Sequence, residues 1–252
     1  MESTWTATVV EHHRLRHDLA VVRLIGDAVP FEAGQYVDVS IPQNPRLLRR
    51  LSPALPPSQD GKLEFHVRTV PGGWISGAIV ADTQPGDRWQ ILDPRGTMTI
   101  DDTGRDVVMV AGGTGLAPFR SILLDLARRE SPPKVFLFVG DRTPRDLYAS
   151  DMLVLLLQQL PWLTVVPVVE SVYDPEWQDD WYEQIRQNLG SDSIGFREED
   201  LIEGNLADVV SSYGAFVDNQ VLVCGSAAMV RATIDSLRAT GTPSENITFD
   251  PY

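Results

Sequence analysis

The pattern of apolar and polar residues changes once along the chain, near residues 102–106. Before this point, short apolar runs are separated by turns rich in Gly, Pro and Asp. Several short runs at such spacing predict a small antiparallel β-barrel. The expected strands are Thr6–Val10, Ala20–Leu24, Tyr36–Ile41, Leu63–Thr69 and Arg88–Leu92, with one helix that begins at Trp74 or Ile75 and ends at Ala81.

After residue 106, strand-like runs alternate with amphipathic stretches. This alternation predicts an open, mostly parallel sheet with helices on both faces. The expected strands are Val107–Ala111, Val135–Val139, Thr164–Val169, Val221–Cys224 and Ile247–Phe249, and the expected helices are Phe119–Arg129, Asp146–Leu160, Leu206–Tyr213 and Ala227–Ala239. We therefore predict two domains, 1–104 and 105–252.

The segment 171–203 interrupts this alternation and is strongly acidic. It holds 10 acidic and 2 basic residues, a net charge of −8 out of −14 for the whole chain. Trp177, Trp181 and Tyr182 lie among these charges. One interpretation is a surface insertion whose aromatic side chains pack back onto the sheet. The other is a docking face or lid.

Composition narrows the class of protein. With 43% hydrophobic and 22% charged residues, the chain is typical of a folded soluble protein. A net charge of −14 argues against nonspecific binding to nucleic acid or to an anionic membrane. The single cysteine, Cys224, cannot form an intramolecular disulfide or ligate an iron–sulfur cluster or structural zinc, so no metal site is expected. No signal-peptide pattern is visible, and a cytoplasmic protein is expected.

A glycine turn follows the first strand of the second half. Gly112, Gly113 and Gly115 interrupt an apolar run, and Pro118 opens the next amphipathic stretch. Without side chains, such a turn lets the backbone approach a ligand closely, and the N–H groups at the helix start suit a phosphate. The pattern is neither G-x-G-x-x-G nor a P-loop. A tight strand–helix connection without a ligand remains the alternative.

The first half contains a similar element at 66–76. A strand is followed by a glycine turn and a helix start, with Ser76 near the first helical turn. An anion fits there, and Arg49 could pair with the same anion from the other side. Two phosphate sites, one in each domain, imply two nucleotides.

With these motifs in order, the chain resembles the ferredoxin–NADP reductase family of FAD- and NAD(P)-binding oxidoreductases. The flavin motif Arg-x-Tyr/Phe-Ser is matched by Arg49, Leu51 and Ser52, and Gly-x-x-Ser/Thr by Gly73–Ser76. The pyridine-nucleotide motif is matched by Gly112–Pro118, and Cys-Gly-x-x-x-Met by Cys224, Gly225 and Met229. Within the family, Phe65–Arg68, Trp162–Val169 and Gly204–Val210 resemble the reductase half of bacterial flavohemoglobins and related stand-alone reductases.

The resemblance implies a bound FAD, with FMN as the less favoured alternative. Arg49 would bind its diphosphate, and the Ser52 hydroxyl would lie near N5, the atom that accepts hydride. Leu51 stands where the family usually has an aromatic residue, so ring stacking is lost. For His66, the alternative is a strand histidine that does no proton chemistry. The other residues expected to line the flavin are Val67, Arg68, Gly72, Gly73, Trp74, Ile75 and Ser76.

The resemblance also implies a site for a pyridine nucleotide. Gly112–Gly115 and Pro118 would hold its diphosphate, with a hydroxyl bond from Thr114. Gly225 and Met229 would lie at the same edge of the sheet. Cys224 would contact the nicotinamide, not as a nucleophile; a small buried cysteine is the alternative. Tyr252 would stack on the flavin, unless the terminus frays. The implied catalytic set is Ser52, Cys224 and Tyr252.

The residues after two strands bear on the choice between NADH and NADPH. A 2′-phosphate requires Arg or Lys. Glu170 would repel that phosphate, as would Asp141, whereas Arg142 would attract it. We therefore expect a preference for NADH.

Together these features favour a flavin-dependent NAD(P)H reductase that passes electrons to an external acceptor. A globin, an oxygenase and a cytochrome component are the candidate acceptor proteins, and the acidic segment could steer an electropositive one. The alternatives are an electron-transfer or regulatory subunit of a larger complex, and a reductase of free flavin.

Overall fold

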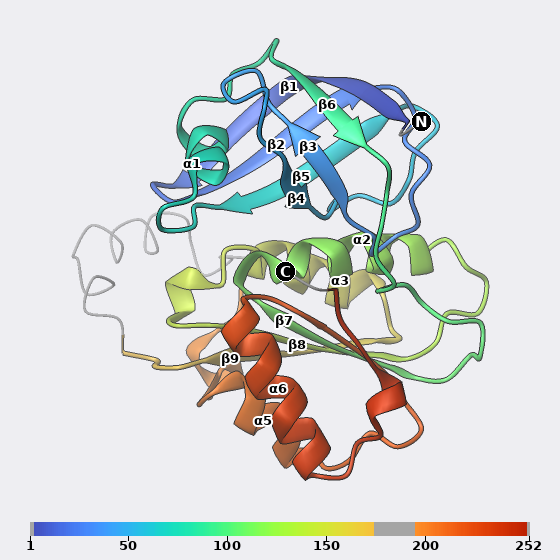
Figure 1. Cartoon of the computed structure of the whole chain (residues 1–252). Helices are drawn as coiled ribbons and strands as arrows, with labels where there is room; N and C mark the ends of the chain where they lie inside the picture. The colour runs from blue at the N-terminus through green and yellow to red at the C-terminus, as the bar shows by residue number, and fades with distance from the viewer. Residues whose placement is uncertain (1–2, 174–194, 251–252) are drawn as a thin grey trace. The chain divides into compact units, whose positions relative to one another are not determined.

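The structure is a computed structural model that describes residues 3–173 and 195–250 (Figure 1). It divides into two compact units. The first comprises residues 1–100 and 114–130, and the second comprises residues 101–113 and 131–252. The segment 114–130 thus belongs with the first unit, although it follows a strand of the second.

The first unit is built on a six-stranded antiparallel sheet with the order β4-β3-β6-β1-β2-β5 (Figure 1). The strands are β1 (Thr4–Arg16), β2 (Leu19–Gly26), β3 (Val37–Ser40), β4 (Arg49–Leu51), β5 (Lys62–Arg68) and β6 (Arg88–Leu92), and the helix is α1 (Trp74–Ala81). The predicted antiparallel barrel is confirmed. Strand β4 was not expected, because only three residues pair with β3.

Alternation along β5 separates the core of this unit from a polar face. Leu63, Phe65 and Val67 are buried in the barrel core, where the Phe65 ring stacks on Trp89 at 5.9 Å between centroids. The intervening residues are Glu64, His66 and Arg68, which a strand must direct to the opposite face. His66 and Arg68, which were expected to line the flavin, therefore lie on the face of β5 opposite the barrel core.

The second unit contains a six-stranded sheet with the order β10-β9-β8-β7-β11-β12, in which every pairing is parallel. Its strands are β7 (Val107–Gly112), β8 (Val135–Asp141), β9 (Leu163–Val169), β10 (Ile202–Glu203), β11 (Gln220–Cys224) and β12 (Ile247–Thr248). The predicted parallel sheet is confirmed. The short β10, within the acidic segment, was not expected.

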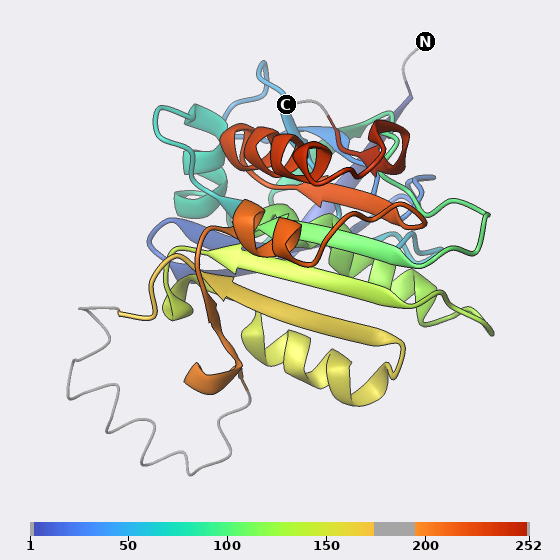
Figure 2. The same ribbon diagram turned by 90° about the horizontal axis from the view of Figure 1, so that it is seen from below.

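Helices cover both faces of the parallel sheet, as predicted (Figure 2). Helices α5 (Leu206–Ser212) and α6 (Ala227–Ala239) pack on one face through an apolar cluster that includes Val210 and Leu237. Helix α3 (Ser150–Gln159) lies on the other face, against β9. The expected helix Asp146–Leu160 starts late, because Leu147 has ψ 66° and separates a short 3₁₀ turn from α3.

Helix α2 (Leu116–Leu126) follows β7 and a single 3₁₀ turn, Gly113–Gly115. It begins two residues before Pro118, which was expected to open it. Proline is tolerated within the first turn, where its missing N–H has no helical partner. The first turn of α2 therefore starts directly at the last glycine of the turn.

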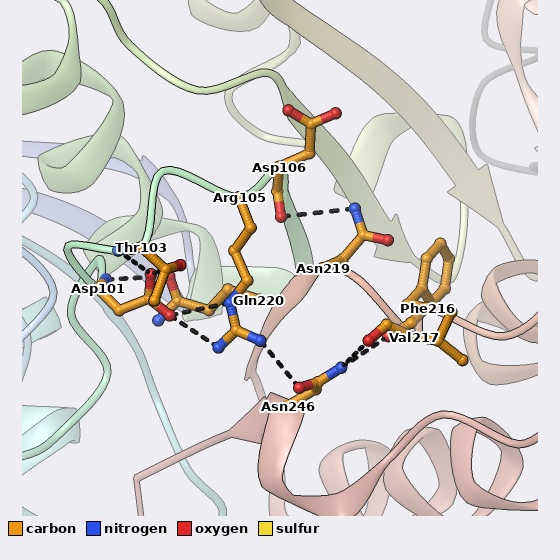
Figure 3. Close-up of polar contacts among 9 residues, drawn as sticks. All are labelled: Asp101, Thr103, Arg105, Asp106, Phe216, Val217, Asn219, Gln220 and Asn246. Carbon is orange, nitrogen blue, oxygen red and sulfur yellow. Dashed lines mark hydrogen bonds and ion pairs between the residues drawn. The ribbon is translucent and has the colours of Figure 1, made fainter.

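A polar network fastens the start of the second unit (Figure 3). Arg105 binds the Asp101 carboxylate with Nε at 3.0 Å and Nη2 at 2.7 Å, and its Nη1 donates to Asn246 Oδ1 at 2.8 Å. Burial opposes ionisation of Asp101, but hydrogen bonds from Thr103 and Arg105 lower the pKa of its carboxyl. The network thus fixes the chain just before β7 begins.

Some predictions fall on residues that are not described. In the acidic segment, 174–194 lie outside the described residues, and Trp177, Trp181 and Tyr182 are among them. Neither interpretation of that segment is tested. Among the residues that are described, no helix combines the length and apolar character needed to span a membrane.

Candidate functional site

In the first unit, the chain that follows β4 runs beside β5, although these two strands lie at opposite ends of the strand order. Arg49 and Leu51 lie on β4, at one end of the strand order, and His66 lies on β5, at the other end. The chain after β4 runs beside β5, since Ala54 N donates to Glu64 O at 2.7 Å. Ser52 is therefore held close to β5 by the backbone.

Arg49 carries a buried nitrogen that suits an anionic ligand. Its Nε is buried and makes no hydrogen bond in the structure. Its neighbour Arg50 is different, because the guanidinium lies over the Tyr36 ring, 4.3 Å from the centroid. A buried guanidinium nitrogen without an acceptor is costly, and a phosphate oxygen would remove that cost.

The turn before α1 is shaped by Gly72, Gly73 and Ser76. Gly72 has φ +75°, a conformation that favours glycine. The Ser76 hydroxyl accepts from Val70 N at 3.0 Å and donates to Gly73 O at 3.2 Å. Ser76 thus closes the turn with its side chain. At the helix start, Gly73 is the N-cap and offers no side chain, which leaves room for an anion.

The remaining predicted flavin residues lie in different surroundings. The side chains of Val67 and Ile75 pack into the barrel core, so only their backbone could contact a ligand. Trp74 is 82% exposed beside the glycine turn. Arg68 lies near the Asp18 carboxylate, at 4.0 Å.

In the second unit, strand register aligns the predicted nucleotide residues at one edge of the sheet. Ala111 pairs with Cys224, Gly112 with Gly140, and Asp141 with Val169. These residues end parallel strands, so they all lie at the carboxyl edge, where open α/β sheets bind ligands.

Met229 links two of the predicted motifs. A Cβ added to Gly112 would lie 3.0 Å from Met229 Cε, and one added to Gly225 would lie 3.0 Å from Met229 Sδ and 3.2 Å from Gly112 N. The methionine thus fills space that both glycines leave open. This packing explains the spacing in Cys-Gly-x-x-x-Met, since Ser226 caps α6 by accepting from Met229 N.

Cys224 is held as a neutral thiol. Burial raises its pKa, and the nearby Asp250 charge raises it further, to about 12. A thiol that stays protonated is a poor nucleophile, which agrees with the expectation that Cys224 does not act as one. Its contact with the nicotinamide stays a prediction. Tyr252, the third predicted catalytic residue, lies outside the described residues.

Two family models match the chain in sequence. An oxidoreductase FAD-binding domain matches residues 6–100, and an oxidoreductase NAD-binding domain matches residues 109–235. The chain belongs to the FAD- and NAD-binding oxidoreductases.

This oxidoreductase is similar to reductase components of oxygenases. It is 31% identical over 254 residues to a terephthalate 1,2-dioxygenase reductase component of Comamonas, covering 98% of this chain and 68% of the relative. It is 35% identical over 170 residues to the xylene/toluene monooxygenase electron transfer component of Pseudomonas putida, covering 66% of this chain and 48% of the relative. The chain thus spans about half the length of some curated relatives that it matches, with 48% and 54% in two of them.

Solved structures agree with the family. The ferredoxin reductase of a carbazole 1,9a-dioxygenase matches with a TM-score of 0.79 and 28% identity, over 99% of this chain and 69% of that chain. A flavohemoglobin from Malassezia yamatoensis matches with a TM-score of 0.74 and 16% identity, over 98% of this chain and 59% of that chain, and so shows the fold alone. The buried Arg49 nitrogen and the uncapped α1 start, both in the FAD-binding part, fit an FAD diphosphate.

Sequence reasoning missed one buried charge cluster in the oxidoreductase. The Glu64 side chain is 4% exposed, and it binds Arg23 Nε at 2.7 Å, Arg120 Nη1 at 2.9 Å and His66 Nε2 at 3.0 Å. The sequence pattern that could have indicated this cluster is the alternation along β5, which places Glu64 and His66 on one face of the strand. Nothing in the sequence indicated that Arg120 reaches them.

The cluster keeps Glu64 ionised. Burial alone would raise its pKa, but the His66 hydrogen bond, the Arg120 charge and the Arg23 hydrogen bond together lower the pKa from 4.5 to about 2. Burial and partners thus act in opposite directions, and the partners prevail.

This shift predicts how stability depends on pH. Because the folded-state pKa is lowered, the stabilisation is fully present above the unfolded-state value of 4.5 and is lost as the pH falls toward 2. Its full size is about 3 kcal/mol. We expect the unfolding free energy of the wild type to approach that of Glu64→Gln as the pH is lowered from neutrality, measured by urea unfolding. A difference that stays constant with pH would contradict the lowered pKa.

Proposed function

We propose that this oxidoreductase binds FAD, oxidises NADH and passes the electrons to a separate oxygenase component. The observation that carries the proposal is the packing of Met229 against Gly112 and Gly225, which unites two nucleotide motifs at the carboxyl edge of the sheet. The relatives named as oxygenase reductase or electron transfer components support the choice of acceptor. Within these 252 residues, the single cysteine cannot ligate an iron–sulfur cluster.

When bound, FAD supplies hydride acceptance and one-electron release, and the protein supplies binding and orientation. Arg49 and the start of α1 would hold the FAD diphosphate. The Ser52 hydroxyl would donate a hydrogen bond to the ring system, and Leu51 would cover the ring without aromatic stacking. Cys224 would offer a neutral thiol to the nicotinamide. The hydride step needs no general acid or base from the protein.

The preference for NADH is supported by two carboxylates on neighbouring strands. Asp141 ends β8, and Glu170 directly follows β9, with Glu170 N donating to Asp141 O at 3.1 Å. Glu170 is exposed, so its charge is available to a ligand. Arg142 is exposed too, but its Nε lies 3.9 Å from the Asp146 carboxylate. A 2′-phosphate would therefore be repelled by Asp141 and Glu170. Its attraction to Arg142 would be weakened, because that guanidinium already lies near a carboxylate.

We expect the double variant Asp141→Asn/Glu170→Arg to raise the ratio of kcat/KM for NADPH to kcat/KM for NADH by about 100-fold. The new ion pair with the 2′-phosphate and the loss of two repulsive charges together supply the required change of about 2.8 kcal/mol, at about 1.4 kcal/mol for each factor of ten. The measurement is steady-state reduction of an artificial acceptor with each nucleotide. Glu245→Arg is a control for added positive charge, because Glu245 lies just before β12, at the amino end of its strand. A wild-type preference for NADPH would contradict the proposed NADH specificity.

The acceptor is tested with purified oxygenase components. Flavin that stays with the protein through gel filtration, together with NADH-dependent reduction of an oxygenase component, supports the proposal. Flavin that separates from the protein and is then reduced as a free substrate favours the alternative of a flavin reductase. Retained flavin that NADH does not reduce favours a regulatory subunit.

A further inference from the structure

Two consecutive residues of helix α2 bind to the part of the first unit that is expected to hold the flavin. Arg120 Nη1 binds Glu64 Oε1 at 2.9 Å and donates to Ala54 O at 2.8 Å. Ser121 Oγ donates to Leu55 O at 2.9 Å. All these residues belong to the first unit. They join α2 to β5 and to the segment that follows Ser52.

Helix α2 is also the one that follows the glycine turn. α2 begins at Leu116, its N-cap is Gly115, and no side chain caps its first turn. Helices α5 and α6 are capped by Asn205 and Ser226, whereas α1 and α3 share with α2 the lack of a side-chain cap. The start of α2, which is expected to bind the nucleotide diphosphate, thus belongs to a helix that contacts the strands expected to bind the flavin.

Stability alone does not explain why this contact is ionic. Although the partners of Glu64 lower its pKa, a buried ion pair often stabilises a fold no better than well-packed apolar residues of the same volume. Orientation is a stronger reason, since displacement of a reacting group by about 1 Å can slow a reaction roughly 100-fold.

We propose that Glu64 and Arg120 form a positioning pair that fixes the start of α2 against β5, and with it the direction of the backbone N–H groups that are assigned to the nucleotide diphosphate. The inference rests on the proposed function. Neither residue is expected to touch a substrate. They act through the position of α2.

The pair is tested by two matched variants. Arg120→Met removes the ion pair with Glu64 and the hydrogen bond to Ala54 O that come from α2. Arg23→Met removes the ion pairs that β2 makes with the same carboxylate at 2.7 Å and with Glu11 at 2.7 Å. We expect the limiting rate of flavin reduction by NADH, measured by anaerobic stopped flow, to fall about 10- to 30-fold in Arg120→Met. It should change less than about twofold in Arg23→Met, with Arg120→Lys restoring part of the loss.

Hydrogen exchange of the flavin-free protein provides a readout that does not depend on activity. Amides of 116–126 should exchange faster in Arg120→Met and at the wild-type rate in Arg23→Met. Two outcomes would overturn the inference and leave the proposed function standing. One is equal slowing of flavin reduction in both variants, and the other is a wild-type rate of both flavin reduction and hydrogen exchange in Arg120→Met. A wild-type protein that neither NADH nor NADPH reduces would overturn the proposed function and the inference with it.

Discussion

Replacing Arg49 with glutamine is expected to weaken flavin binding about 100-fold, because it removes roughly 3 kcal/mol of charge-assisted hydrogen bonding. The Arg49 Nε is buried and makes no hydrogen bond in the structure, which leaves it able to bind a phosphate oxygen. Glutamine keeps the stem of the side chain and removes the charge. The dissociation constant is measured by titrating the flavin-free protein with FAD and following the quenching of flavin fluorescence.

Arg50→Gln is the matched control, since it removes the same charge one residue further along β4. Arg50 lies over the Tyr36 ring, at 4.3 Å, and its loss should cost only about 0.5–1 kcal/mol of stability. We expect its affinity for FAD to stay within about threefold of the wild type. Equal weakening by both substitutions would show that general positive charge, not the Arg49 position, holds the flavin.

Replacing Gly113 with valine is expected to lower kcat/KM for NADH by about 100-fold or more while FAD stays bound. Gly113 has φ +54°, a left-handed conformation that costs a non-glycine residue about 1–2 kcal/mol. To relieve that strain, the turn would rotate its peptide groups, and the N–H groups assigned to the diphosphate would change direction. Turnover with NADH and the flavin content of the variant are measured together.

Gly104→Val imposes similar strain away from the predicted nucleotide site. Gly104 has φ +73°, lies in the loop before β7, and has open space where a Cβ would project. We expect a comparable loss of thermal stability in both variants, but near wild-type turnover in Gly104→Val. If both variants lost turnover equally, strain in the second unit would explain the effect without a diphosphate.

The two sheets could be predicted from the sequence because each has its own hydrophobic period. Alternation of apolar residues in β5 and the continuous apolar run of β7 reflect burial on one face and on both faces of a sheet, respectively. The short strands β4 and β10 were not predicted, since two or three residues carry no period. The equally short β12 was expected only because it continues the alternation of strands and helices. Leu147 has a non-helical ψ of 66°, so the helix expected from Asp146 begins only at Ser150, and the apolar pattern of the sequence does not indicate this interruption.

The candidate site was predicted in part. Motif spacing indicated Arg49 and the glycine turns, and the contact of Met229 with Gly112 and Gly225 gives that spacing a physical cause. The cluster of Glu64, His66 and Arg120 was missed, because its members are brought together from β5 and α2. Ion pairs between residues that lie far apart in the sequence leave no pattern from which they can be predicted. The roles of the individual site residues stay predictions until variants are measured.

The proposed electron transfer is tested most directly by mixing the flavin-loaded protein with stoichiometric NADH in the absence of oxygen. We expect the absorbance of oxidised flavin to bleach after mixing and to return when a purified oxygenase component is added. Unchanged absorbance with both NADH and NADPH, in a protein whose flavin is still bleached by dithionite, would contradict hydride transfer from a pyridine nucleotide to the flavin.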